Sequence, residues 1–177
     1  MMKSIWMVAV LCGSSAAPLI GQTGSDSAVA APRRQNAWVS LGVGVSQLGE
    51  GATISGWYGR NKLVLGAQVA GGSEGFLSSR DVQAISVQVG ARAMGRHGTA
   101  LIAIGPARMD GWHTEPDGTF FGHSVRDNKG EFGVAASAEA LVHMRYAGLG
   151  VGLFAAGSGH EHLTGATVTL HLGSIGG

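Results

Sequence analysis

The feature that most constrains this chain is a series of eight segments in which apolar residues alternate with small or polar ones. The segments cover residues 36–46, 51–59, 62–72, 81–94, 99–109, 131–144, 147–156 and 163–173. Successive side chains of a β-strand point to opposite faces, so a period of two predicts strands with one apolar face. We therefore expect an all-β domain of eight strands.

The connections between these segments tend to alternate in length. The longer ones are Ser73–Arg80, Asp110–Gly130, Gly157–His162 and, only marginally, Gln47–Glu50. The shorter ones lie at residues 60–62, 95–98 and 145–147. Bacterial outer-membrane barrels have short periplasmic turns and longer outside loops, and this asymmetry predicts the same architecture.

Composition excludes several other classes of protein. The 177 residues allow one domain, and the 31 glycines disfavour a helical protein, because glycine weakens a helix interior. Beyond the N-terminus no apolar run approaches the ~20 residues of a spanning helix. A net charge of +1 provides no basic field, so we expect no nucleic-acid partner.

The two faces of the predicted strands differ in a way that favours a membrane. One face is aliphatic; in the fourth segment it consists of Ile85, Val87, Val89, Ala91 and Ala93. The opposite face is small or polar, rich in glycine and poor in Lys and Glu, which is unusual for a solvated surface. Such residues suit the narrow lumen of an eight-stranded barrel, with the aliphatic face against lipid. A soluble barrel or sandwich, with the aliphatic face inside, is the alternative.

The N-terminal residues have the pattern of an export signal. Lys3 precedes the apolar run Ile5–Leu11 and a small-residue stretch, so residues 1–30 are predicted as a signal peptide cleaved after Gly21 or Ala30. Residues 31–35 are then a flexible lead-in, 36–173 the barrel and 174–177 a tail. The only cysteine, Cys12, lies in the signal, so the mature protein should lack disulfides; acylation of Cys12 in a lipoprotein is the alternative.

The polar face carries the charges that we expect inside the barrel. Arg92 and Glu139 should share one lumen network, because a charge in a narrow lumen needs a partner. The full predicted set is Arg92, Glu139, His143, His171, Gln68 and Gln88. A structural polar plug is the main interpretation, and a proton or ion path is the alternative.

Other residue combinations do not amount to a site. His160 and His162, with His113 and His123 elsewhere, supply too few convergent ligands to predict a metal site. His123 and Ser124 with Glu115 or Asp127 supply the residue types of a hydrolase, but without a recognisable motif. We therefore assign no catalytic residue, metal or cofactor.

Aromatic residues and one proline add detail to the expected barrel. Trp38, Trp57, Tyr58 and Tyr146 are expected at the periplasmic rim, and Phe76, Trp112, Phe120, Phe121 and Phe132 at or beyond the outer rim. Interfacial girdles of this kind are typical of membrane barrels. Pro106 cannot donate a ladder hydrogen bond, so a bulge is expected there.

Together, the export signal, the eight segments and the loop asymmetry resemble the small outer-membrane barrels typified by OmpA and OmpX. The similarity covers residues 36–173 and is one of pattern; the last strand lacks the terminal aromatic that family members often have. The resemblance implies an eight-stranded antiparallel up-and-down barrel in a bacterial outer membrane, in contact with its lipid.

The expected role of such a barrel is structural or one of surface interaction. Recognition would reside in Asp110–Gly130, through Trp112, Phe120 and Phe121, and secondarily in Ser73–Arg80, because function concentrates in loops on a rigid scaffold. A lipid-modifying enzyme, a narrow pore and a soluble periplasmic ligand-binding barrel are the alternatives, and the sequence leaves the oligomeric state open.

Overall fold

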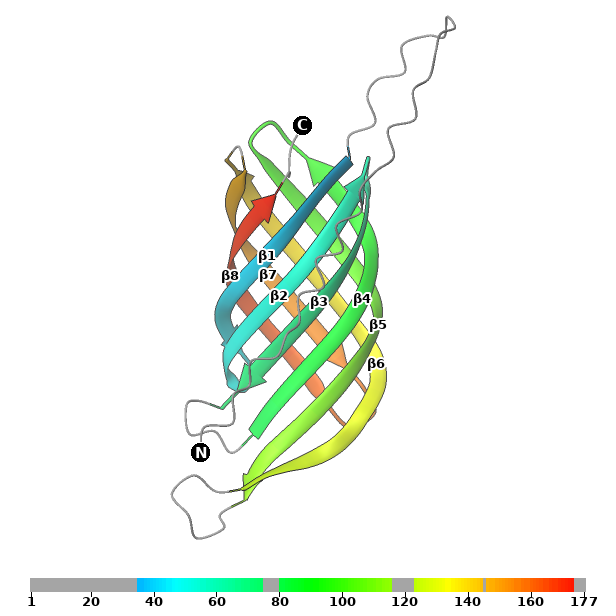
Figure 1. Cartoon of the computed structure of the whole chain (residues 1–177), viewed down its shortest axis with the longest axis vertical. Helices are drawn as coiled ribbons and strands as arrows, with labels where there is room; N and C mark the ends of the chain where they lie inside the picture. Colours follow the sequence, from blue (N-terminus) through cyan, green and yellow to red (C-terminus); the bar gives the residue numbers. More distant parts are fainter. Residues whose placement is uncertain (1–34, 75–79, 116–122, 145, 174–177) are drawn as a thin grey trace, which may run out of the picture. The chain divides into compact units, whose positions relative to one another are not determined.

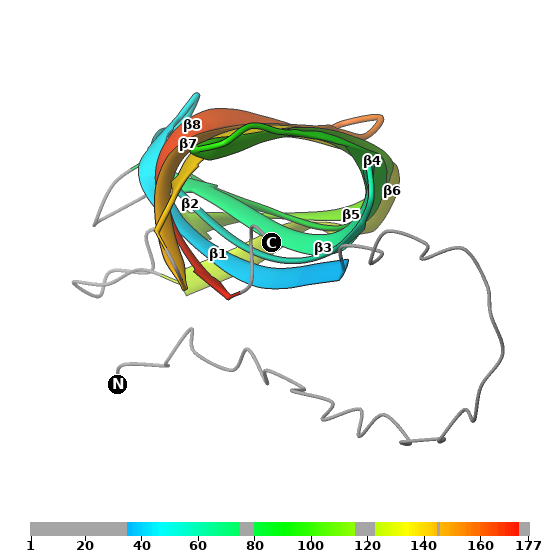
Figure 2. The ribbon, with the colours of Figure 1, turned by 90° about the horizontal axis from the view of Figure 1, so that it is seen from above.

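The computed structural model shows a closed barrel of eight antiparallel strands, in which each strand pairs with the next and β8 pairs back with β1 (Figures 1 and 2). The strands are β1 (Gln35–Ser46), β2 (Gly49–Arg60), β3 (Leu63–Ser73), β4 (Arg80–Met94), β5 (Gly98–Glu115), β6 (His123–His143), β7 (Ala147–Gly157) and β8 (His162–Gly173). Closure leaves no unpaired strand edge, which is the property a sheet needs in a bilayer. The predicted fold class is confirmed.

The structure describes residues 35–74, 80–115, 123–144 and 146–173, without the side chains of 35, 114, 115, 123–129 and 143. The predicted signal peptide, most of the lead-in and the tail lie outside these residues. In the part of the chain that is described, no helix is long and apolar enough to cross a membrane.

The strands β5 and β6 extend far beyond the others at the lower end of the barrel in Figure 1. They have 18 and 21 residues, against 11 to 15 in the other six strands. They run through most of the stretch Asp110–Gly130, so the prediction of an irregular loop there is wrong outside the undescribed tip, residues 116–122. Polar composition alone does not distinguish a loop from a solvated hairpin, whose strands have no apolar face to bury.

The irregularity in this hairpin lies further along than expected. The β5–β6 register shifts between Met109 and Gly111 and again between Gly111 and Trp112, whereas Pro106 keeps its place opposite Val134. Pro106 faces outward at the rim and leaves the ladder with β6 in register. The bulges therefore mark the point where the hairpin leaves the barrel wall.

One predicted longer connection is also wrong. Ser46 pairs directly with Gly49, so β1 and β2 are joined by a two-residue turn. Gly49 has φ +128°, a conformation open to glycine but strained for other residues, and this permits the tight reversal. At the opposite end, the β2–β3 turn places Asn61 at φ +56°, which asparagine tolerates.

The aliphatic face points outward, as predicted for a membrane barrel. Val87 is 57% exposed, Val151 59% and Phe132 84%, while the inward neighbours Gln88 and Thr169 are each 1% exposed. A soluble barrel would bury the aliphatic face and solvate the polar one. The alternation in this structure is the reverse, which removes the soluble ligand-binding interpretation.

The lumen is filled in three layers. Towards the end with the long hairpin, an apolar cluster contains Ala70, Val82, Ala84, Ala107, Met109, Ala135, Phe154, Ala156 and Leu163. Towards the end with the short turns, a second cluster contains Trp38, Trp57, Val64, Leu101, Ala103 and Leu141. Buried hydroxyl, amide, carboxyl and imidazole groups lie between them. This filling is typical of an eight-stranded barrel, whose interior is just wide enough for side chains.

Two tryptophans expected at the rim are instead part of this filling. Trp38 and Trp57 face each other across β1 and β2 and stack with ring centroids 6.5 Å apart, each 3% exposed. Tyr58 and Tyr146 do lie on the exposed outer side at this end. Strand period places Trp57 with inward Ser55, so alternation was the correct guide and the rim assignment was not.

Candidate functional site

The first polar group of the lumen is centred on Glu139 of β6. Its carboxylate accepts hydrogen bonds from Ser40 and Ser55, both with donor–acceptor distances of 3.4 Å. The Trp57 indole donates to the Ser55 hydroxyl at 2.9 Å, which orients that serine. Glu139 is 5% exposed, so these hydroxyls take the place of water around the carboxylate.

His171 of β8 completes this group. The Ser40 hydroxyl lies 2.7 Å from His171 Nδ1, and the Thr169 hydroxyl lies 2.7 Å from Nε2. Glu139 Oε2 is 3.9 Å from Nδ1. Serine, histidine and glutamate are thus together, but His171 is 0% exposed and both ring nitrogens are occupied. No substrate can reach the hydroxyl, so this arrangement serves the stability of the barrel and not hydrolysis.

The second polar group is centred on Gln88 of β4. Its amide nitrogen donates to Gln68 Oε1 at 3.0 Å and to the Ser86 hydroxyl at 2.8 Å. The Ser137 hydroxyl donates to Gln88 Oε1 at 2.6 Å. Gln68 and Gln88 were predicted as neighbours and are hydrogen-bonded. Ser137 and Glu139 are adjacent inward residues of β6, so the two groups form one polar layer.

Arg92 lies apart from that layer. Its Nε donates to the Asn61 carbonyl oxygen at 2.8 Å, and its guanidinium carbon lies 5.8 Å from the Trp38 ring centroid. Among the described residues no hydrogen bond or ion pair joins Arg92 to Glu139. The sharing of one network by these two charges stays a prediction, and the side chain of His143 is not described.

The serines and threonine that hold Glu139 and His171 were not singled out from the sequence. Their common signal is position: each lies on the inward face of its strand by the period of two. The sequence thus identified the set of residues that face the lumen, while cross-lumen partners depend on how far neighbouring strands are displaced along one another.

At the hairpin end, loops are fixed to the barrel by charged groups. Arg80 donates to Glu161 Oε2 at 2.8 Å, and Glu161 is 4% exposed. Glu131 of β6 accepts from the Ser158 hydroxyl at 2.8 Å and lies 2.6 Å from His160 Nδ1. The Ser158 hydrogen bond, followed by His160, lowers the pKa of Glu131. His160 is therefore engaged with a carboxylate, and the described residues contain no metal-binding group of three or more ligands.

The predicted recognition residues lie on the β5–β6 hairpin. Trp112 is half-buried on β5 and pairs in register with Asp81 of β4 and Arg126 of β6. Phe120 and Phe121 lie outside the described residues, as do the side chains of His123 and Ser124. Trp112 therefore sits where the hairpin meets the barrel wall.

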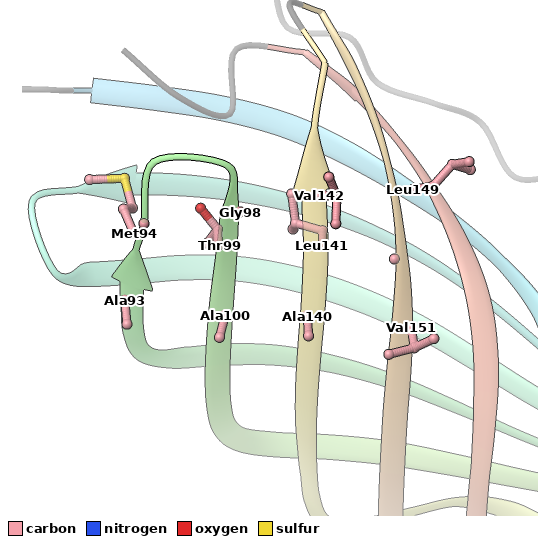
Figure 3. A pocket seen from close by; sticks show the side chains of 12 residues that line it. Ala93, Met94, Gly98, Thr99, Ala100, Ala140, Leu141, Val142, Leu149 and Val151 are labelled. Carbon is pink, nitrogen blue, oxygen red and sulfur yellow. The ribbon is translucent and has the colours of Figure 1, made fainter.

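The outer wall has an apolar hollow at the turn end (Figure 3). Ala93, Ala100, Ala140 and Val151 follow one another in register across β4, β5, β6 and β7. Larger side chains such as Met94, Val142 and Leu149 surround the row of three alanines, leaving an open hollow of about 790 Å³. Its lining is apolar and lies on the aliphatic side of the sheet.

With this geometry established, three solved structures resemble the chain. They are the N-terminal β-barrel domain of OprF from Pseudomonas aeruginosa (TM-score 0.60, 8% identity, 78% of this chain and 96% of that one), Neisserial surface protein A (0.54, 12%, 78% and 94%) and Ail, the attachment invasion locus protein of Yersinia pestis (0.51, 13%, 79% and 96%). The chain has the fold of the small outer-membrane barrels.

The resemblance predicted from the sequence pattern is thereby confirmed at the level of the fold. No protein-family model and no curated protein sequence matches the chain. Identities of 8–13% carry no residue roles from those barrels to this one. The role of the chain has to be argued from its own surfaces.

Proposed function

We propose that this chain is inserted in the outer membrane of a bacterium and acts there as a small structural and surface-interaction barrel. The observation that carries the proposal is the outward aliphatic band. On β6 the band runs from Phe132 to Val142, and the outward positions between them are apolar or alanine. Its length matches the ~9–11 residues of a membrane-spanning strand.

Charged residues bound this band at both ends. Arg60 is the first charged outward residue at the turn end of β2, and Arg108 is the first at the hairpin end of β5. Between such limits lipid chains can cover the barrel, and the row of alanines beside Val151 offers a hollow of suitable chemistry for one acyl chain. The filled lumen supports a solid barrel and disfavours the narrow pore.

The orientation follows from the connections. Short turns and both ends of the strand series, Gln35 and Gly173, lie at one end, which corresponds to the periplasmic side of such barrels. The β5–β6 hairpin then projects from the cell surface. Its strands continue beyond the apolar band, so it presents an extended surface to a partner outside the cell, with residues 73–80 beside it.

Cysteine labelling tests the membrane location and orientation. The only cysteine, Cys12, lies in the predicted export segment, so single cysteines can be introduced freely. A membrane-impermeant maleimide should label Glu115→Cys in intact cells and the matched Arg96→Cys only after the outer membrane is permeabilised. Labelling of both sites in intact cells, the reverse pattern, or recovery of the protein in the soluble periplasm would contradict the proposal.

Replacement of the hairpin tests the surface role. Exchange of Thr114–Asn128 for a short Gly-Ser turn should leave the barrel folded, because the β5–β6 pairs from Gly98–Val142 to Met109–Glu131 are retained. Heat-modifiable gel migration measures folding. Attachment of producing cells to immobilised matrix glycans and proteins, relative to non-producing cells, measures recognition.

Three outcomes distinguish the possibilities for the hairpin. Loss of attachment with retained heat modifiability supports recognition by the hairpin, and a matched exchange of residues 75–79 shows whether the neighbouring loop contributes. Equal attachment without the hairpin would refute its role. Loss of folding would show that the hairpin is a structural part of the barrel, and the recognition proposal would be withdrawn.

A further inference from the structure

Three buried side chains at the turn end of the lumen carry hydrogen-bond donors without acceptors. Asn36 and Trp38 are each 3% exposed and Arg92 is 4% exposed. Asn36 Nδ2, Trp38 Nε1 and both terminal nitrogens of Arg92 make no hydrogen bond to any described residue. Every one of these atoms is an N–H donor. Buried donors of this kind are normally paired, so a cluster of them indicates a place for an acceptor.

The fold brings the three side chains together over one glycine. Asn36 of β1 pairs in register with Gly59 of β2. The inward side of Gly59 is occupied by the Arg92 guanidinium, which a Cβ at that position would overlap. The same guanidinium lies over the Trp38 ring, and its Nε is fixed by the Asn61 carbonyl. The two free terminal nitrogens are thus held in place from β4 beside the two donors of β1.

The charges around this mouth are of one sign. The exposed cations Arg60, Lys62 and Arg96 lie in the neighbouring turns, and the described residues of this end include no Asp or Glu. The described acidic side chains lie at the hairpin end, apart from Glu139 in the middle of the lumen: Glu50, Glu74, Asp81, Asp110, Glu131 and Glu161. The electrostatic potential at the turn end therefore favours an anion.

We propose that Arg92, Asn36 and Trp38 form an oxyanion site that takes a phosphate group at the turn end of the lumen. A guanidinium donates two parallel hydrogen bonds to a phosphate, and the tetrahedral group has further oxygens for an amide and an indole N–H. The phosphate belongs either to the headgroup of an anionic phospholipid in the adjoining leaflet or to a free phosphate. The site does not depend on any role of the outer hairpin.

Tryptophan fluorescence can measure this binding, because Trp38 is stacked against Trp57 and lies under the Arg92 guanidinium. The protein is refolded in phosphatidylcholine vesicles in a Trp112→Phe background, which removes the signal of the distant hairpin. One arm titrates inorganic phosphate, and the other raises the fraction of phosphatidylglycerol. We expect a saturable change in at least one arm, weakened at least tenfold by Arg92→Gln and less than twofold by the matched Arg96→Gln.

The two arms distinguish the sources of the phosphate. Saturation with inorganic phosphate alone supports a free-anion site, and saturation with phosphatidylglycerol alone supports a headgroup site. The absence of a saturable change in both arms overturns the proposal. An equal loss in Arg92→Gln and Arg96→Gln also overturns it, since general attraction to a basic surface would then explain the binding.

A second variant protects the test against a folding defect. Gly59→Ala keeps every charge but displaces the guanidinium, and Asn36→Ala removes only the amide donor. Each should weaken binding at least fivefold while heat-modifiable migration shows a folded barrel. Unchanged binding in both folded variants would overturn the site even if Arg92→Gln cannot be refolded.

Discussion

An arginine on the outward face of β4 provides the sharpest test of membrane residence. Val87 is 57% exposed and lies in the middle of its strand, between the charged turn at one end and the outer rim at the other. Arg or Lys at the bilayer midplane costs ~2–4 kcal/mol in a barrel, falling to ~0–1 kcal/mol near the interface. Val87→Arg should therefore lower the unfolding equilibrium constant's stability margin by roughly 30-fold to several-hundred-fold.

The same strand supplies the control. Met94 is 38% exposed at the turn end of β4, next to Gly95 and Arg96, so Met94→Arg places the same side chain near the interface. Urea unfolding of both variants and of the wild type in phosphatidylcholine vesicles, followed by tryptophan fluorescence, gives the free energies. Equal effects at the two positions, or a Val87→Arg variant as stable as the wild type, would refute the lipid-facing assignment.

A lumen substitution would not discriminate in this way. Ser86 is 4% exposed and its hydroxyl accepts a hydrogen bond from Gln88. Ser86→Arg would overpack the lumen whether lipid or water surrounded the barrel. The informative arginine is the one that points outward.

Two further predictions concern packing and pH. A Cβ at inward Gly66 would overlap an indole ring, whereas outward Gly56 has nothing within 4 Å; Gly66→Ala should therefore cost ~1–3 kcal/mol in the same urea assay and Gly56→Ala should be nearly neutral. The pKa of Glu131 lies below its ordinary value of 4.5, so its bonds to Ser158 and His160 stabilise the loop above that pH and are lost as the pH falls through the lower folded pKa. Amide hydrogen exchange of residues 158–161 should rise in that range in the wild type but not in Glu131→Gln, and a pH-independent wild type would contradict the assignment.

The sequence was a good guide wherever the answer depended on local alternation. It predicted eight strands, most of their ends, and which face of each strand meets the outside. It also separated Gln68, Gln88, Glu139 and His171 as lumen residues. The period of two fixes the side of the sheet on which a residue lies, independently of the rest of the molecule.

The errors occurred where composition replaced alternation. Asp110–Gly130 is polar and was expected to be a loop, yet β5 and β6 continue into it, because a solvated hairpin needs no apolar face. Trp38 and Trp57 were expected at the rim as aromatics, although their place in the period is inward. In both cases the general preference of a residue type was weaker than the geometry of the strand that contains it.

The sequence by itself thus determined the barrel's strands, the lipid-facing side and the contents of the lumen. Only the closed tertiary structure decided which lumen residues meet. Ser40 reaches His171 because β1 closes onto β8, and Arg92 lies over Gly59 because β3 separates their strands by one position. Closure and strand displacement are properties of all eight strands together, so no local pattern could have paired Glu139 with serines or left Arg92 beside Asn36.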